Sequence, residues 1–134
     1  MTASRSHLLT QTELVLPEQA NHYGTLFGPN GLALLGKAAF LVATRFTRQS
    51  VVMVAAGRIE FPQPIPVGSM LKLTARVIRV GRSSMTVQAA ACFDTDTAPG
   101  IAGEEVLRGE FEMVTVDERG RPCPVAASLA QNEP

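Results

Sequence analysis

The chain has 134 residues, a length that suits a single domain. Hydrophobic residues make up 46% of it, which is enough to build a buried core and excludes an intrinsically disordered chain. Twelve basic residues balance twelve acidic ones, so the bulk charge gives no reason to expect a nucleic acid or an anionic membrane surface as a partner.

The N-terminal segment, MTASRSHLLTQTELVL, lacks the apolar stretch and the small-residue cleavage site of a secretory signal. The longest apolar run, AAFLVAT, is too short to span a bilayer. Cys92 and Cys123 do not have the spacing of a metal site or a CxxC motif, and we expect one thiol in the core and one in a Pro-rich tail. These features predict a cytoplasmic protein without a metal site.

The first predicted element is a strand, because HLLTQTELVLP alternates loosely and stops at Pro17. The next stretch, EQANHYGTLFGPNG, contains three glycines and a proline, which is typical of a loop. This loop is followed directly by the most apolar part of the chain.

That apolar segment, GLALLGKAAFLVATRFTRQS, predicts a helix with Asn30 as its N-cap. Apolar residues occupy nearly all of its circumference, apart from a narrow stripe formed by Lys37, Thr44 and Arg48. We therefore expect protein to cover the helix on most sides and the stripe to face solvent. Gly36 lies in the middle of the helix, where glycine costs about 1 kcal/mol relative to alanine, so it marks a packing requirement or a replaced side chain.

Four further strands are predicted in series, SVVMVAAGRIEF, MLKLTARVIRV, SMTVQAAACF and EVLRGEFEMVTV, and we expect them to form a meander. In MLKLTARVIRV the alternation places Arg79 on the same face as Leu71 and Val77. One apolar helix and about five antiparallel strands predict an α+β domain whose sheet curls around the helix. Such a sheet leaves an exposed edge, and edge pairing between two copies would cover it.

The stretch NHYGTLFG, in this order of elements, resembles the hotdog-fold acyl-CoA thioesterases, in particular the acyl-CoA hydrolase branch. GRIEFPQPIPVGSMLKLTARVIRVGRSSMTV and VTVDERGRPCPV are similar to the later strands and the closing tail of that family. The resemblance implies a hotdog fold, in which an antiparallel sheet of five to six strands wraps one long central helix. We expect one such domain over residues 8–118, with tails over 1–7 and 119–134.

The same resemblance implies the hydrolysis of acyl-CoA thioesters to free acid and CoA at a dimer interface. Coenzyme A would enter as part of the substrate, and no separate cofactor is expected. Members of the family are homodimers, or tetramers and hexamers built from dimers. Their thioester carbonyl lies near the N-terminus of the central helix, where a backbone N–H polarises it and a carboxylate activates water or attacks the carbonyl.

The resemblance and the side-chain chemistry together assign seven residues to substrate binding: Gly24, Phe27, Gly28, Arg58, Arg82, Ser83 and Ser84. The glycines and the phenylalanine belong to the family motif. The arginines and serines suit phosphates and the amides of the pantetheine arm, because a guanidinium binds phosphate bidentately. Ordinary surface arginines and turn serines would give the same pattern.

Four residues are candidates for the catalytic step: Asn21, His22, Thr25 and Glu60. Asn21 can orient a water or hold the thioester carbonyl, and an Asx-turn is the alternative role. His22 is a candidate general base or an exposed loop residue. Thr25 can donate a hydrogen bond but is a poor nucleophile without an adjacent base. Glu60 is expected to be solvent-facing or ion-paired, on the opposite face from Gly57.

The acidic positions of the family hold other residues in this chain. Thr25, Gly36 and Gly57 stand where relatives often carry an acid, and Pro29 has no N–H to offer where a second glycine is usual. Residues 19–59 contain no Asp or Glu at all. An alternative function is therefore a non-catalytic protein that binds acyl-CoA. A hotdog dehydratase ranks below both, because it would need an acid paired with a loop histidine.

Overall fold

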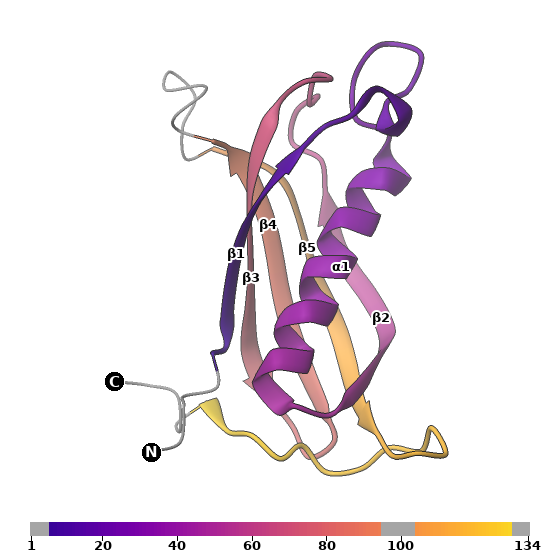
Figure 1. Ribbon diagram of the computed structural model, residues 1–134, viewed down its shortest axis with the longest axis vertical. Coiled ribbons are helices and arrows are strands. Elements are labelled where there is room, and N and C mark those ends of the chain that lie inside the picture. The colour runs from indigo at the N-terminus through magenta and orange to yellow at the C-terminus, as the bar shows by residue number, and fades with distance from the viewer. Residues whose placement is uncertain (1–5, 95–103, 130–134) are drawn as a thin grey trace.

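The computed structural model describes residues 6–94 and 104–129, which form a curved sheet and one long helix (Figure 1). The helix lies across the concave face of the sheet, so the expected α+β architecture is confirmed. The elements in chain order are β1 Leu8–Leu14, the short 3-10 helix η1 Pro17–Gln19, α1 Gly28–Thr47, β2 Ser50–Glu60, β3 Met70–Val80, β4 Ser84–Phe93 and β5 Glu105–Val116.

The five strands are all antiparallel to their neighbours and lie in the order β1-β3-β4-β5-β2. β3, β4 and β5 form a meander, but β2 pairs with β5 on the far side of the sheet. The expected four-strand meander is therefore wrong at β2. The link over residues 61–69 carries the chain back across the sheet, and β1 and β2 become its two edges.

α1 begins three residues earlier than the sequence pattern predicted, and its N-cap is Phe27 rather than Asn30. Pro29 lies in the first turn, where a residue without an N–H is tolerated because first-turn donors have no intrahelical acceptor. The N–H groups of Asn30 and Gly31 both donate to the carbonyl of Phe27, at 2.9 and 3.1 Å. The proline that suggested a loop is thus part of a helix start.

The core lies between α1 and the concave face of the sheet. Lys37 and Arg48 of the polar stripe are exposed, so the prediction that the stripe faces solvent is confirmed for these two residues. Thr44 is half-buried. Nine residues of α1 are buried: Gly31, Leu34, Leu35, Ala38, Ala39, Val42, Ala43, Phe46 and Thr47. The inward-facing residues of β3, β4 and β5 pack against them, and the largest are Leu71, Leu73, Met85, Leu107, Phe111 and Met113.

Bulges in β3 and β2 change which side chains share a face. The shift in β3 after Val77 turns Arg79 to the convex face, where its guanidinium lies 3.6 Å from Glu112, so its predicted inward position is wrong. A bulge inserts one residue and reverses the alternation beyond it. The shift in β2 likewise sets Gly57 and Glu60 on one face, which corrects the prediction that they lie on opposite faces.

The segment after β5 packs on the domain at the end where α1 stops. Gln49 holds it through its carboxamide, which donates to the carbonyl of Pro124 at 3.0 Å and accepts from the N–H of Ala126 at 2.9 Å. Ala127 is buried as a result. The described part of the C-terminal segment therefore packs against the domain. Cys92 lies half-exposed on the convex face of β4, outside the core where it was expected.

Gly109 in β5 is a close-packing glycine, because a Cβ at this position would overlap Cδ1 of Ile59 on the neighbouring strand. We expect Gly109→Ala to lower the free energy of unfolding by about 1–3 kcal/mol, the usual cost of overpacking a core. Urea denaturation measures the loss. Ile59→Val removes the overlapping methyl group, so the same glycine replacement should cost less in that background. An equal cost in both backgrounds would contradict the packing described.

Candidate functional site

The loop before α1 is closed by the side chain of Asn21. Its Oδ1 accepts from the N–H of Tyr23 at 2.9 Å, and from the N–H and the hydroxyl of Thr25, both at 3.2 Å. The N–H of Asn21 donates to the carbonyl of Thr25 at 2.8 Å. Gly24 has φ of +81°, a conformation that glycine adopts without strain. The Asx-turn considered for Asn21 is present, and it fixes the shape of the loop.

Backbone hydrogen bonds anchor this loop to its surroundings on both sides. The carbonyl of Gly24 accepts from Val67 at 3.0 Å, and the N–H of Leu26 donates to Ile65 at 2.7 Å. The N–H of Phe27 donates to the carbonyl of Gln19 at 2.9 Å. The loop is therefore held between η1 and the link that precedes β3, and its position sets where α1 begins.

The N-terminus of α1 offers one hydrogen-bond donor. Pro29 has no N–H, and the N–H groups of Asn30 and Gly31 are taken by Phe27. Within the described part of the chain no group accepts from the N–H of Gly28. The first turn also carries no acidic residue, so its positive dipole end is not compensated there.

One flank of α1, on the side of β2, is apolar and exposed. Leu32, Gly36 and Phe40 follow one another at intervals of four residues along this flank, and Met53 of β2 reaches it. A Cβ on Gly36 would lie 3.2 Å from Cε of Met53, so the thioether occupies the space beside the glycine. We refer to these four residues as the apolar strip. Leu32, Phe40 and Met53 are 36–46% exposed.

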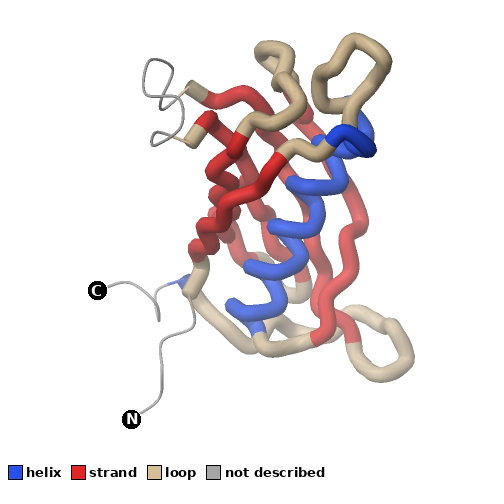
Figure 2. The backbone as a smooth tube through the Cα atoms, turned by 45° about the horizontal axis from the view of Figure 1, so that its top comes forward, coloured by secondary structure: helices blue, strands red, loops and turns tan. Residues whose placement is uncertain are grey.

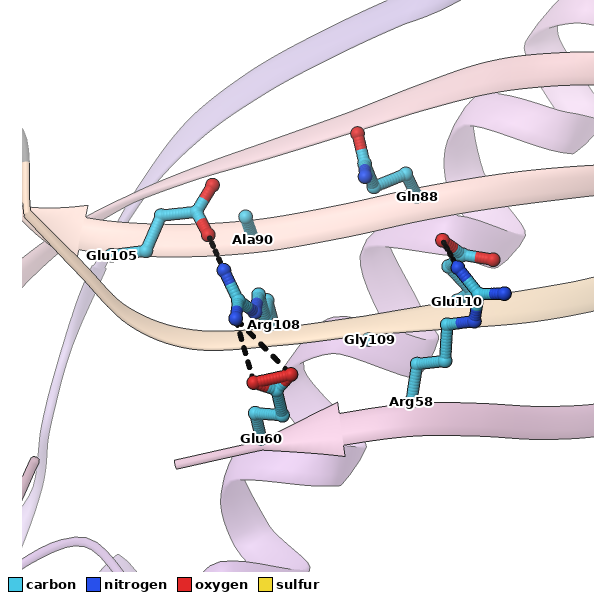
Figure 3. A pocket seen from close by; sticks show the side chains of 8 residues that line it. All are labelled: Arg58, Glu60, Gln88, Ala90, Glu105, Arg108, Gly109 and Glu110. Atoms are coloured by element: carbon cyan, nitrogen blue, oxygen red, sulfur yellow. Dashed lines mark hydrogen bonds and ion pairs between the residues drawn. The ribbon is translucent and has the colours of Figure 1, made fainter. Parts of the chain in front are cut away.

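Glu60 lies on the convex face of the sheet, away from α1, and is ion-paired as expected. Its Oε1 accepts from Nη2 of Arg108 at 2.6 Å, and Nη1 of the same arginine donates to Glu105 at 3.1 Å. The hydrogen bond from Arg108, followed by its charge, lowers the pKa of the Glu60 carboxyl. Arg58 pairs with Glu110 at 3.7 Å on the same face, beside a shallow polar hollow of about 330 Å³ (Figure 3).

The remaining predicted residues lie at two other places. His22 is exposed at the loop tip, and its ring lies 4.0 Å from that of Tyr23. Arg82 and Ser83 lie in the β3–β4 turn at the far end of the sheet, where their carbonyls accept from the N–H groups of Val125 and Thr115. Five predicted residues lie in the loop before α1 and at its first residue: Asn21, Gly24, Thr25, Phe27 and Gly28. The β3–β4 turn lies at the opposite end of α1 (Figure 1 and Figure 2).

Two residues near the helix were not predicted as parts of the site. Met53 covers Gly36, and the ring of Phe61 lies over the first turn of α1, 3.7 Å and 3.2 Å from Cβ atoms built on Gly28 and Gly31. Phe61 directly follows β2 and precedes a proline, which favours extended backbone and marks the end of the strand but does not reveal the contact of the ring with α1. In residues 6–94 and 104–129 there is no group of three His, Cys, Asp or Glu side chains that could hold a metal ion. No described helix is long and apolar enough to cross a membrane.

Comparisons with known proteins agree with this architecture. An uncharacterized acyl-CoA thioester hydrolase of Zymomonas mobilis is 36% identical over 116 residues, which cover 84% of this chain and 74% of that protein. An acyl-CoA hydrolase of Staphylococcus aureus, solved with butyryl coenzyme A, coenzyme A and coenzyme A disulfide, superposes with a TM-score of 0.78. It is 26% identical, and the match covers 92% of this chain and 72% of that one.

A hexameric acyl-CoA thioesterase solved without ligand is 33% identical, with a TM-score of 0.81 and coverage of 89% of this chain and 75% of that chain. The five-stranded sheet wrapped around one long helix is the hotdog fold of these structures, as the sequence predicted. The family model described as thioesterase superfamily matches residues 23–99, more than half of the chain. The chain therefore belongs to the thioesterase superfamily.

Proposed function

We propose that the protein hydrolyses acyl-CoA thioesters to free acid and CoA. The observation that carries the proposal is the free N–H of Gly28 at the positive end of α1, presented by the loop that Asn21 closes. A thioester carbonyl needs such a donor when charge develops on its oxygen, and the acyl chain needs an apolar wall such as the apolar strip. The names of the relatives from Zymomonas mobilis and Staphylococcus aureus support this substrate class.

The site is completed by a second copy of the chain. β2 is an edge strand with exposed apolar residues, of which Val54 is 59% exposed, and the apolar strip continues this surface onto α1. Antiparallel pairing of β2 with its symmetry mate covers both. Such a two-fold brings the β3–β4 turn of one protomer toward the loop of the other. Arg82, Ser83 and Ser84 would then meet the pantetheine arm from the partner side. The related thioesterase solved without ligand is hexameric, which agrees with self-association.

A second candidate function, acyl-CoA binding without hydrolysis, is favoured by the charges around the site. Residues 19–59 contain no Asp or Glu, Glu18 is exposed on η1, and Glu60 is engaged by Arg108 on the opposite face of the sheet. At Gly36, where relatives often carry an acid, the adjacent space is filled by the thioether of Met53. A positioned general base typically contributes a factor of about 10²–10⁴ to the rate, so hydrolysis without one is slow.

Free-thiol detection with a panel of acyl-CoAs, run beside a binding titration, separates the two functions. Hydrolysis predicts CoA release that scales with protein concentration. Saturable binding without CoA release would support the non-catalytic binding function instead of hydrolysis. The absence of both CoA release and binding would exclude both functions.

If the protein does hydrolyse acyl-CoA, substitutions can identify the general base. His22→Ala should lower kcat if the imidazole is the base. Glu60→Gln should leave kcat unchanged, because its carboxyl faces away from α1.

The mass in solution tests the shared site. We expect at least twice the chain mass of 14.3 kDa by light scattering. Val54→Lys places a charge in the β2 edge and should shift the mass toward the monomer, because edge lysines oppose strand pairing. Gln88→Lys, on the convex face of β4, is the matched control and should keep the dimer. A monomeric wild-type protein would contradict a site built from two protomers.

The missing carboxylate can be restored at Gly36. Among the residues that the structure describes, an added Cβ closely approaches only the flexible end of the Met53 side chain, which can move aside. We expect Gly36→Asp to raise kcat for acyl-CoA hydrolysis by about 10²-fold, the range of a positioned base. Gly36→Asn has nearly the same shape without the charge and should give no such gain. Equal rates for the two variants would show that a carboxylate here does not limit the reaction.

A further inference from the structure

The ring of Phe61 stands against the first turn of α1. Its Cε1 is 3.2 Å from a Cβ built on Gly31, and that Cβ also lies 3.2 and 3.3 Å from Leu26 and Leu107, so Gly31 is enclosed. Around Gly28 the space is open. Apart from the chain neighbours and the backbone of the helix, the only described atom within 4 Å of a Cβ built there is Cζ of Phe61, at 3.7 Å. Among the described residues, the ring is therefore the single wall of the space beside Gly28.

The end of β2 holds the ring in this place. Arg58 has φ of +53°, a conformation that a residue other than glycine adopts only at a cost, and it lies in the second bulge of the strand. The next residue, Ile59, packs directly on Gly109, which has no side chain to keep it away. Pro62 follows the ring and favours extended backbone at Phe61. Backbone strain persists where the surrounding structure determines it, and here it belongs to the segment that carries the ring to α1.

The ring keeps a free surface although it is held. Phe61 is 46% exposed, whereas Phe46, Phe93 and Phe111 of the core are at most 6% exposed. One edge of the Phe61 ring packs over Gly31, and the remainder is open to contact. A group that is fixed on one side loses little conformational freedom when a ligand packs on the other.

A thioester bound to the N–H of Gly28 comes within reach of this ring. Two bonds separate a Cβ from the nitrogen of the same residue, so the ring reaches to within about 6 Å of the Gly28 nitrogen. The oxygen of a bound carbonyl lies about 3 Å from that nitrogen. Apolar atoms are in contact at about 4 Å. The ring can therefore touch the groups attached to the carbonyl carbon, and the first carbon of the acyl chain is one of them.

We propose that Phe61 is a specificity-determining residue, whose ring restricts the acyl-CoA substrates to those without a branch at the carbon next to the carbonyl. The proposal rests on the proposed function, because it names a substrate class for the same site. A straight chain sets only hydrogen atoms of that carbon against the ring. A methyl branch has to displace the ring or draw the carbonyl away from Gly28, and closely packed groups yield to neither without cost.

Two isomeric CoA analogues isolate this contact. Both are non-hydrolysable ketones in which a methylene replaces the sulfur, and they carry a 2-methylbutanoyl or a 3-methylbutanoyl group. They differ only in the position of one methyl group, so the ratio of their dissociation constants cancels the contributions of CoA and of acyl size. We expect the wild-type protein to bind the 3-methyl isomer about tenfold or more tightly, the discrimination that a pocket achieves for one such carbon.

Substitutions at Phe61 test whether the ring causes this preference. Phe61→Ala removes the wall, and the ratio should fall to within about threefold of one. Phe61→Leu keeps an apolar side chain for packing but lacks Cζ, so it should also lower the ratio, with a thermal midpoint closer to that of the wild type. Tyr23→Ala is the control, because it removes a ring that is 78% exposed at the loop tip, and it should keep the ratio.

The results that would overturn the proposal are distinct from failure of the proposed function. Equal binding or equal rejection of the two isomers by the wild-type protein would overturn it, and so would a preference that persists unchanged in both Phe61 variants. The straight butanoyl ketone serves as the reference ligand. If the wild-type protein does not bind this ketone either, the proposed function itself fails.

Discussion

An apolar helix that one sheet cannot cover is the constraint on which the structure depends. α1 buries nine of its residues against the concave face of the sheet. Burying so much of the helix surface requires the sheet to curve around it. The sheet covers the helix between β1 and β2 and leaves the flank of Leu32, Gly36 and Phe40 open. Because β2 crosses to the edge beside that flank, the outer edge of β2 and the uncovered helix surface form one continuous apolar region. A second copy of the chain is the partner that fits such a region.

The same helix sets the chemistry at its N-terminus. The loop closed by Asn21 and the proline in the first turn determine that α1 starts at Gly28, with one free N–H. Donors are therefore available where a carbonyl oxygen would lie. Acceptors for a water proton are scarce, because the chain has no acid between residues 18 and 60 and Met53 occupies the place beside Gly36. The site is better suited to hold and polarise a thioester than to activate the water that cleaves it.

The sequence predicted the parts of this fold that rest on local pattern. The bounds of β3, β4 and β5 agree with the expected segments. In β3 and β5 the alternation of apolar and polar residues marks a strand with one buried face, and in β4 the turn before it and the polar loop after it mark the ends. The position of β2 was missed, because pairing with β5 is a non-local choice that hydrophobic pattern does not encode. The faces of Arg79 and Gly57 were misassigned for a different reason: a bulge reverses the alternation and leaves no clear mark in the sequence.

In the candidate site, too, the sequence predicted local features but not the contacts between distant segments. The motif NHYGTLFG correctly located the loop, and the Asx-turn followed from the chemistry of asparagine. The contact of Met53 with Gly36 joins two elements and required coordinates, as did the separation of Arg82–Ser84 from the helix start. The sequence indicated an ion-paired or solvent-facing Glu60, whereas its partner Arg108 could not be named because the β2–β5 pairing was unknown.

The central claim is that the loop and the start of α1 polarise the carbonyl of a bound acyl thioester. Isotope-edited infrared spectroscopy of a non-hydrolysable acyl-CoA analogue, in which a methylene replaces the sulfur and the carbonyl carries ¹³C, measures this directly. A hydrogen bond from the N–H of Gly28 would weaken the C=O bond, so the account predicts that the carbonyl stretch of the bound analogue lies at lower frequency than that of the analogue in an aprotic solvent, with a narrow band. A bound carbonyl whose frequency equals the aprotic value would contradict it.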